Sequence, residues 1–354
     1  MKTTMKSIIK TLVLVTVIIL FLIFLVLAWF TVNDYRPDDV INLDVYGNPA
    51  QSRASELTVI TWNIGYAGLG EGQDFFLDGG IAVQPSLQEM QENLLGIGTF
   101  LEQSEADVFL LQEVDRNSKR TNSLDQVDLL AEAVPGSQMT FAYNYNVPFV
   151  PIPPTQPMGR IEAGLYTLSR VRIRQSTRYQ LPGSYPWPMN TVHLDRCILV
   201  TRHQAPNSRE WVVINLHSSA YDASGNLREQ QFEFVNNFMQ NEYIEGNYVV
   251  VGGDWNSLLP GVSPNEFLSA ELPPEYLIQI PEHFTPNGWQ WCFDQHIPTN
   301  RSLAAPYEEG RNFVTIIDGI LVSPNIEVIE YETIDMGFSY SDHQPVRAVL
   351  SAEE

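Results

Sequence analysis

Six apolar segments of this chain each stop on polar side chains, and no other feature of the sequence constrains the fold as strongly. The apolar part of such a segment is typical of a buried strand, so its polar end is held rigidly at the edge of a sheet. The six ends are Trp62-Asn63, Leu111-Gln112-Glu113, Asn215-Leu216-His217, Asp254-Trp255-Asn256, Ile317-Asp318 and Ser341-Asp342-His343. If these ends converge, one edge of the fold brings carboxylates, amides and imidazoles together.

Strand and helix patterns alternate between these ends. Apolar residues at helical spacing predict helices over residues 86–103, 124–134 and 227–239. Segments with strand character outnumber the helices, above all between residues 140 and 217, and the chain has no internal repeat. We therefore predict a single α/β (α+β) domain over residues 56–354, in which two packed, mostly antiparallel sheets are flanked by helices.

The N-terminal region predicts a membrane anchor. Ile8 to Phe30 is a run of 23 almost wholly apolar residues, and about 20 helical residues cross a bilayer. A cleaved signal peptide is the alternative, but it usually has a shorter apolar core and a small-residue cleavage site, which is not evident here. Three lysines lie before the run or in its first turn, and three aspartates follow it. The positive-inside rule then predicts a cytoplasmic segment 1–7, a single-pass transmembrane helix 8–30, a polar linker 31–55 and an extracytoplasmic domain.

The charge balance argues against a protein that holds nucleic acid through its phosphates. The chain has 20 Lys and Arg against 42 Asp and Glu, a net charge of −22. Without the three N-terminal lysines, 17 basic and 42 acidic residues remain, a net charge of −25. Nonspecific binding of nucleic acid needs clustered Lys and Arg.

The two cysteines, Cys197 and Cys292, do not form a disulfide framework. One bridge between them and two buried thiols are both compatible with the sequence. We favour two core residues, because neither cysteine has metal-ligand spacing.

Carboxylates, imidazoles and amides held together suit a hard divalent cation. Mg²⁺ typically takes one or two carboxylates, keeps several waters and binds substrate phosphate, which is the equipment for cleavage of a phosphoester. Each polar end also has a structural explanation when it is taken alone. Asn63 is compatible with a turn before Gly65, Glu113 with a solvated charge, and Asp254 with a turn after a strand. Six such ends in one chain favour the functional interpretation.

These motifs, in this order, resemble the endonuclease/exonuclease/phosphatase superfamily. This family includes DNase I-like nucleases, inositol-polyphosphate 5-phosphatases and neutral sphingomyelinases. The resemblance implies a four-layered α/β sandwich with two sheets at its centre, and it extends over about residues 57 to 350. The matching segments are Thr61–Asn63, Leu111–Val114, Gly164–Arg170, Asn215–His217, Gly253–Asn256, Ile317–Leu321 and Ser341–Val346.

The resemblance also implies a role for each polar end. Glu113 is expected to be the principal Mg²⁺ ligand, helped by Asn63 and Asp342, with Mn²⁺ or Ca²⁺ as other possible ions. Asp254 is expected to orient or deprotonate the attacking water, and Asn256 to hold the phosphate. His343 is expected to stabilise charge in the transition state, and Asp318 to accept a hydrogen bond from His343. His217, the last of the expected catalytic residues, would bind the phosphate or protonate the leaving oxygen. The family leaves open whether Asp254 or His343 is the base, and whether one metal or two are bound.

Subfamily features leave the substrate less defined. No Arg follows Gly253–Asn256, and Asp318 already occupies the place of the partner of the final His, which weakens the 5-phosphatase interpretation. Arg170, Arg172, Arg174 and Arg178 alternate along one strand, so we expect them on one solvated face rather than in a nucleic-acid groove.

A lipid substrate gains support from the expected anchor, since a tether of about 25 residues keeps the domain close to the outer leaflet. Aromatic and apolar residues also lie at 149–154, 185–187, Trp289 and Trp291. These segments are compatible with contact with lipid or with packing on the sandwich, and we favour packing by a small margin. Arg160 and Arg301 are lone basic residues in loops, which suit a second phosphate or pairing with surface acids.

The sequence therefore predicts a Mg²⁺-dependent hydrolase of a phosphodiester or phosphomonoester, with a lipid head group favoured over nucleic acid. An extracytoplasmic endonuclease or exonuclease is the first alternative. A catalytically degenerate binding module is an alternative of another class, and the complete set of expected site residues argues against it. The sequence does not indicate an oligomeric state.

Overall fold

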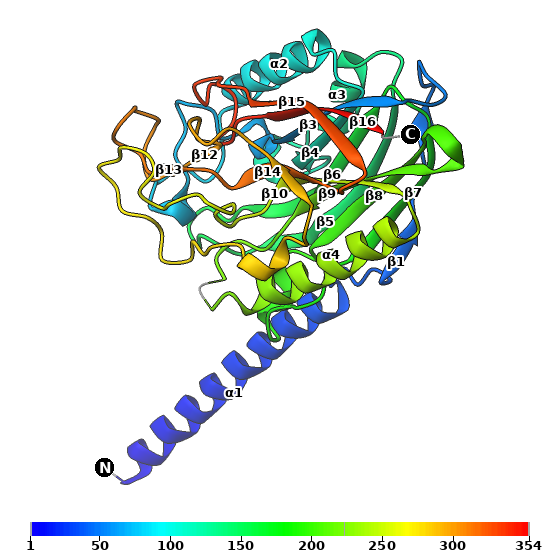
Figure 1. Cartoon of the computed structure of the whole chain (residues 1–354). Coiled ribbons are helices and arrows are strands. Elements are labelled where there is room, and N and C mark those ends of the chain that lie inside the picture. The colour runs from blue at the N-terminus through cyan, green and yellow to red at the C-terminus, as the bar shows by residue number, and fades with distance from the viewer. Residues whose placement is uncertain (1, 223, 353–354) are drawn as a thin grey trace.

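Two seven-stranded β-sheets lie face to face at the centre of the protein (Figure 1), in a computed structural model that describes residues 2–222 and 224–352. The first sheet has the order β1 (Val40–Asn42), β7 (Ile173–Gln180), β8 (Cys197–Gln204), β9 (Glu210–His217), β10 (Tyr248–Asp254), β14 (Asp318–Val322) and β11 (Gln290–Cys292). The second has the order β15 (Ile326–Thr333), β16 (Val346–Ala352), β3 (Glu56–Asn63), β4 (Val108–Asp115), β6 (Gly159–Ser169), β5 (Gln138–Val150) and β2 (Tyr46–Gly47). Strands β12 (Asn300–Arg301) and β13 (Val314–Thr315) form a small separate pair.

Helices cover both outer faces, which completes the predicted four-layered sandwich. Helices α2 (Leu87–Gln103) and α3 (Gln126–Ala133) pack on the second sheet, and α4 (Asn226–Ile244) packs on the first (Figure 1). A separate apolar core fills the space between the sheets, with side chains from β3, β4 and β16 against those from β9, β10 and β14. The predicted fold class is confirmed.

The helices begin where their sequences supply a cap. At the start of α2, Ser86 and Glu89 form a reciprocal capping box, and the side chain of Asp125 caps α3. These side chains satisfy backbone N–H groups that have no partner within the helix. The buried face of α2 consists of Met90, Leu94, Ile97 and Leu101, as the helical spacing predicts.

Strand direction determines which residues share an edge. Neighbouring strands are antiparallel except in two pairs, β3 with β4 and β9 with β10, which are parallel. The ends of these four strands therefore lie together, and an antiparallel neighbour contributes its first residues to the same edge. Asp254 at the end of β10 is opposite both His217 at the end of β9 and Asp318 at the start of β14.

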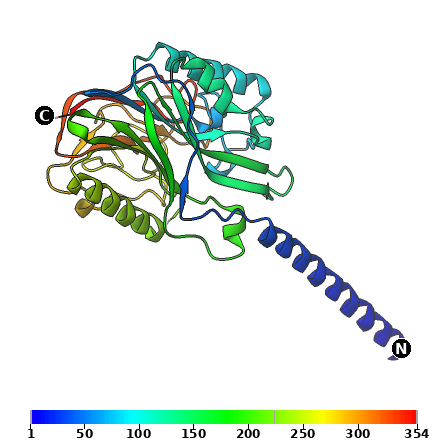
Figure 2. The ribbon, with the colours of Figure 1, turned by 90° about the vertical axis from the view of Figure 1, so that its right-hand side faces the viewer.

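The N-terminal helix α1 (Lys2–Val32) projects away from the sandwich (Figure 2). Its segment Met5–Val32 is long and apolar enough to cross a membrane, and its most apolar stretch is not buried against the rest of the protein. A signal sequence has the same properties.

The segment predicted as a polar linker is in large part bound to the domain, which corrects the boundary at residue 55. Val40–Asn42 pairs with β7 as β1, and Tyr46–Gly47 pairs with β5 as β2. The predicted tether of about 25 residues is therefore reduced to the few residues between α1 and β1. The end of α1 consequently lies close to the domain.

A β-bulge corrects the prediction for the arginines. The register of β7 against β8 shifts between Ile173 and Gln175, so the residues after the bulge point to the opposite face. Arg174 is exposed, whereas Arg178 is buried and donates to the backbone oxygens of Tyr143 and Asp195. The four arginines thus do not share one solvated face.

Other residues follow the predictions. Cys197 and Cys292 are free and buried, which confirms the assignment to the core. Trp289 and Trp291 pack into the apolar cluster beneath α4, so packing rather than lipid contact is the correct interpretation for these two.

Strand β15, which the sequence analysis did not predict, has mostly exposed residues and lies at the edge of its sheet.

Candidate active site

Asp254 lies at the centre of the edge where the polar strand ends converge. One of its carboxylate oxygens, Oδ2, accepts a hydrogen bond from Asn63 Nδ2 at 3.0 Å and lies 3.3 Å from His217 Nε2 and 3.7 Å from His343 Nε2. The other, Oδ1, accepts from the backbone N–H of Asn256 at 2.8 Å. Contacts on both oxygens fix the orientation of this buried carboxylate.

His343 is held from behind by Asp318. Its Nδ1 lies 2.8 Å from Asp318 Oδ2, and its backbone oxygen accepts from Trp62 Nε1 at 2.9 Å. Burial by itself lowers the pKa of His343, but the carboxylates of Asp318, Asp254 and Asp342 more than offset burial and raise the pKa well above its usual value. His343 is therefore a cation at neutral pH.

Burial has the opposite effect on the acid partner. It raises the pKa of Asp318 to about 6, although His343 lowers it. Asp318 Oδ1 is buried and has no hydrogen-bond partner among the described residues. A buried oxygen without a donor is unfavourable, and this orphaned acceptor shows that the site is built for a further positive or hydrogen-bonding group.

Glu113 approaches the site through an irregular strand. The pairing of β4 with β6 is interrupted between Leu111 and Val114, and Glu113 has a φ of +54°. Such a conformation is unfavourable for a residue other than glycine and is often found at functional sites. The half-buried Glu113 then places Oε1 3.3 Å from Asn63 Nδ2.

Asp342 occupies the opposite wall. Burial raises its pKa to about 7, against the opposing effect of His343, and the nearby carboxylate of Glu113 adds to the rise. Gly65 lies against this carboxylate with a φ of +51°, and a Cβ at Gly65 would meet Asp342 Oδ1 at 2.8 Å. Glycine at position 65 therefore lets the loop after β3 close over Asp342.

This donor set fits a hard divalent cation. Oxygen ligands are those that Mg²⁺ and Ca²⁺ prefer, and four acidic side chains surround the site: Glu113, Asp254, Asp318 and Asp342. Ligand atoms of Asp254, Asp318 and His343 lie within 4.8 Å of one another. However, Asp318 Oδ2 and His343 Nδ1 are already engaged with each other, and Asp254 Oδ2 accepts from Asn63. Glu113 and Asp342 have weaker contacts, so they are the better candidates for direct ligands.

Asn63 lies between the two carboxylates, and its role as a metal ligand stays a prediction. Its amide nitrogen faces Glu113 and Asp254, while its oxygen accepts from the backbone N–H of Gly65 at 3.0 Å. To act as a direct metal ligand, the side chain would have to turn and lose these three bonds. In this structure Asn63 is a donor that aligns two carboxylates.

His217 and Asn256 complete the predicted cluster. Burial, followed by the nearby charge of Arg196, lowers the pKa of His217 well below its usual value. His217 is therefore neutral at pH 7. Asn256 donates to the backbone oxygen of Ser218 at 3.0 Å and lies 3.4 Å from Asp254 Oδ2, so its amide also lines the site.

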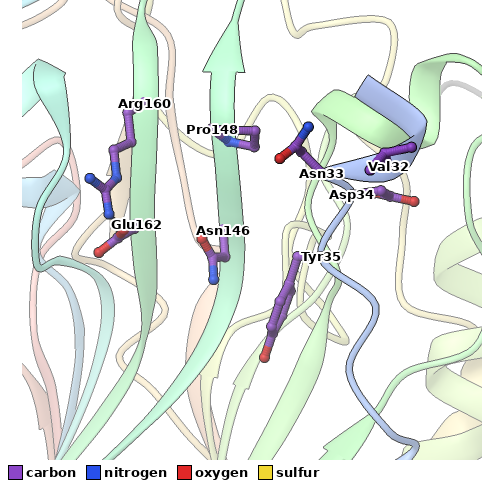
Figure 3. A pocket seen from close by; sticks show the side chains of 8 residues that line it. All are labelled: Val32, Asn33, Asp34, Tyr35, Asn146, Pro148, Arg160 and Glu162. Carbon is purple, nitrogen blue, oxygen red and sulfur yellow. Dashed lines mark hydrogen bonds and ion pairs between the residues drawn. The ribbon is translucent and has the colours of Figure 1, made fainter. Parts of the chain in front are cut away.

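The side chains of the two arginines predicted to bind substrate are engaged with other groups of the protein in this structure. Arg301 is buried, and its guanidinium donates to the backbone oxygens of Leu69, Gly70 and Gln73, so it holds a loop in place. Arg160 forms an ion pair with Glu162 and lines a hollow beside residues 32–35 (Figure 3). Arg301 nevertheless lies next to Asp342, since its backbone N–H donates to the backbone oxygen of Asp342 at 3.0 Å.

Arg196 is a candidate site residue that the sequence analysis missed. Arg196 directly precedes β8, which runs antiparallel to β9, so it lies at the same edge as His217 and donates to the backbone oxygen of His217 at 3.4 Å. Burial lowers its pKa, while the carboxylates of Glu113 and Asp254 oppose this effect. Searching the starts of antiparallel strands, as well as the ends of strands, would have found it. The same search finds Asn300, whose Nδ2 lies 3.0 Å from His343 Nε2.

Comparison with known proteins defines the class of the chain. A sequence model described as the endonuclease/exonuclease/phosphatase family matches residues 60–343, so the chain belongs to this family, whose members are hydrolases of phosphoester bonds. No curated protein sequence matches the chain.

Solved structures share the fold at low sequence identity. A family protein from Beutenbergia cavernae is 19% identical, with a TM-score of 0.55 over 85% of this chain and 72% of its own. The human Nocturnin catalytic domain with a bound sulfate anion is 17% identical, with a TM-score of 0.52 over 88% of this chain and 97% of its own. Truncated TDP2 from Caenorhabditis elegans is 14% identical, with a TM-score of 0.52 over 85% and 99%.

Replacing Asp318 tests the role of the buried pair. Asp318→Asn removes the carboxylate that holds the charge on His343, so the pKa of His343 falls. We expect phosphodiesterase activity to fall by about 10²- to 10⁴-fold. The activity that remains should be lost at a lower pH than in the unsubstituted chain, because His343 then loses its proton at a lower pH. The measurement is kcat/KM against pH, with Asp39→Asn at an exposed position as the control. An unmoved alkaline limb would contradict the pairing.

Metal binding also has a readout that does not need catalysis. Because the pKa of Asp342 is about 7 in the folded chain, against an ordinary value of 3.8, the metal-free chain loses stability as the pH rises between these values. A cation that binds the ionised site restores about 2.7 kcal/mol at about 100 times its Kd. We expect Mg²⁺ or Mn²⁺ to raise the thermal midpoint more at about pH 8 than at about pH 5.

The matched variants for this measurement are Asp342→Asn and Asp39→Asn. The first should reduce the pH dependence of the metal-induced shift, and the second should leave it unchanged. If no divalent ion moves the midpoint at either pH, the proposed metal site is wrong.

Proposed function

We propose that this protein is a divalent-metal-dependent phosphoesterase, which hydrolyses a phosphodiester or phosphomonoester by attack of water. One observation carries the proposal: Asp254 is fixed between His217 and His343, and Asp318 holds the outer nitrogen of His343. A carboxylate, a neutral imidazole and a charged imidazole thus converge on one point. A degenerate binding module would have no need to keep this set complete.

Each side chain has a task that follows from its charge state. Asp254 accepts a hydrogen bond from the attacking water and takes its proton as the water oxygen bonds to phosphorus. The bond between phosphorus and the leaving oxygen breaks, and the leaving oxygen takes a proton from bulk water, to which Asp254 later returns its own. His343, as a cation, donates from Nε2 to a phosphate oxygen, where negative charge grows in the transition state. His217 is neutral, which suits it to donate a hydrogen bond rather than a proton, so we assign it to positioning the phosphate.

The metal and the polar side chains complete the site. A divalent cation, when bound, neutralises charge on the phosphate oxygens, and Glu113 with Asp342 would hold it. Mg²⁺ is our first choice, with Mn²⁺ and Ca²⁺ as alternatives. Asn63 aligns Glu113 with Asp254, Asn256 holds the phosphate, and Arg196 contributes a positive charge at the edge next to His217.

We further propose a single-pass membrane protein with a cytoplasmic N-terminus and an extracytoplasmic catalytic domain. The support is the apolar length of α1 and the lysines that precede it. A domain with a net charge of −25 is unsuited to nucleic acid, so a lipid head group or another small phosphoester is the favoured substrate. An extracytoplasmic nuclease is the alternative.

A substrate panel tests the reaction and its substrate class. Bis-p-nitrophenyl phosphate, sphingomyelin, phosphoinositides, plasmid DNA and RNA are offered to the full chain in detergent with Mg²⁺. We expect hydrolysis of the synthetic diester and of at least one lipid, and a loss of about 10²-fold or more for Glu113→Gln. Glu327→Gln, at an exposed position on β15, is the control.

Two results would contradict the proposal. Nicking of plasmid DNA at physiological salt, with every lipid untouched, would establish the nuclease alternative. If no metal supports hydrolysis and Glu113→Gln changes nothing, the chain is a binding module.

Arg196 provides a separate prediction. A hydrogen bond to a charged group contributes about 1.5–3 kcal/mol, so Arg196→Gln should lower kcat/KM by about 10- to 150-fold, and Arg196→Lys should lower it less. Arg174→Gln, which changes an exposed arginine, is the control. Equal activity of the Gln and Lys variants with the unsubstituted chain would remove Arg196 from the site.

A further inference from the structure

We propose that the outer leaflet of the membrane contacts the domain itself, on a surface that surrounds the end of α1. This surface, the anchor-proximal face, consists of Trp187 and Met189 in the loop before β8 and of Phe149 and Ile152 at the tip of the β5–β6 hairpin. The inference rests on the proposed membrane anchor. It adds that the domain is not tethered loosely but is seated on the bilayer.

The first part of this face touches the anchor directly. Trp187 Nε1 donates to Thr31 Oγ1, in the last turn of α1, at 3.1 Å. Trp187 nevertheless remains 58% exposed and Met189 50% exposed. Tryptophan beside the end of an apolar helix is typical of the membrane–water interface, where its ring and its N–H find different surroundings.

The second part lies on another side of the same helix end. The end of α1 and the hairpin together line a hollow of about 540 Å³, with Val32 to Tyr35 on one wall and Asn146, Pro148 and Arg160 on the other (Figure 3). The hairpin tip projects on the side of the domain from which α1 leaves (Figure 2). Phe149 is 37% exposed and Ile152 is 44% exposed. Two separate loops thus present large apolar side chains around one helix end.

The composition of both loops fits a lipid surface. Residues 181–194 and 147–158 contain no Asp, Glu, Lys or Arg, in a chain with 62 such residues among 354. Transfer of a charged group out of water has a large free-energy cost, whereas transfer of an apolar group out of water is favourable. Charged side chains near the end of α1 lie outside these two loops, where they form the ion pairs Arg36–Asp34 and Arg160–Glu162. The two loops themselves can therefore approach a neutral bilayer without this cost.

The same loop connects the anchor-proximal face to the active site. Tyr145 on β5 donates to the backbone oxygen of Val192 at 3.2 Å, and the N–H of Asp195 donates to the oxygen of Asn144 at 2.8 Å. The next residue, Arg196, lies beside His217. Contact of this loop with the bilayer would therefore fix the orientation of the candidate site relative to the membrane, which favours a phosphoester that is still part of the membrane.

Site-specific fluorescence on the full chain tests the contact. The chain is reconstituted into phosphatidylcholine vesicles that contain a lipid spin-labelled on its acyl chain. Met189→Cys carries an environment-sensitive dye, and Leu95→Cys carries the same dye as the control, because Leu95 is 72% exposed on α2. In Figures 1 and 2, α2 lies on the side of the domain opposite α1. Both native thiols are buried, and burial raises their pKa, so the dye attaches to the introduced cysteine.

We expect the lipid spin label to quench the dye at position 189 several times more strongly than the dye at position 95. We also expect Met189→Asp to lower hydrolysis of a vesicle-embedded substrate by about tenfold, without an effect on soluble bis-p-nitrophenyl phosphate. Leu95→Asp should change neither activity.

The quenching measurement tests the membrane contact, and the hydrolysis measurement tests the proposed function, so the two can fail independently. Equal quenching at both positions, or a chain that does not float with the vesicles, overturns the membrane contact even if the soluble diester is hydrolysed. Strong quenching at position 189 without hydrolysis of any phosphoester supports the contact and overturns the proposed function.

Discussion

Polar contacts between the two sheets create the active site. Asp318, on the first sheet, binds His343, which precedes the last strand of the second, and Asn63 on the second sheet binds Asp254 on the first. Gln112 Nε2, on the second sheet, likewise donates to Asn215 Oδ1, on the first, at 2.8 Å. The Asp318–His343 and Asn63–Asp254 contacts thus link the two sheets, whereas His217 and Asp254 lie on neighbouring strands of the first sheet. The apolar core between the sheets determines their separation, so the geometry of the catalysis depends on packing some distance from the reacting atoms.

The electrostatics of this edge follow from the same packing. Burial raises the pKa of Asp318 and Asp342, whereas the carboxylates around His343 keep it charged. His217, beside Arg196 rather than beside Asp318, stays neutral. The pKa values of two histidines within reach of one carboxylate thus shift in opposite directions, because burial dominates at His217 and the surrounding carboxylates dominate at His343. This difference supports the proposal that His343 stabilises charge and His217 positions the phosphate.

The position of the anchor extends this argument to the membrane. The predicted linker is not a free tether, since it adds one short strand to each sheet. Thr31 then lies within hydrogen-bonding distance of Trp187, in a loop that ends at Arg196. An enzyme built in this way would have its distance from the bilayer determined by the fold rather than by the length of a flexible segment.

The sequence alone determined the fold class, the apolar N-terminal helix, the core positions of the cysteines and the residues that converge on the site. It succeeded because these features are local: an apolar run with a polar end is recognisable without knowledge of its neighbours. The prediction failed where an orientation depends on a distant segment. The bulge in β7 buries Arg178, and backbone oxygens of the loop at residues 69–73 bind the guanidinium of Arg301. Arg196 was missed because its place at the active edge comes from strand direction. Pairing, register and side-chain orientation arise from contacts between segments far apart in the chain, and only the tertiary structure decided them.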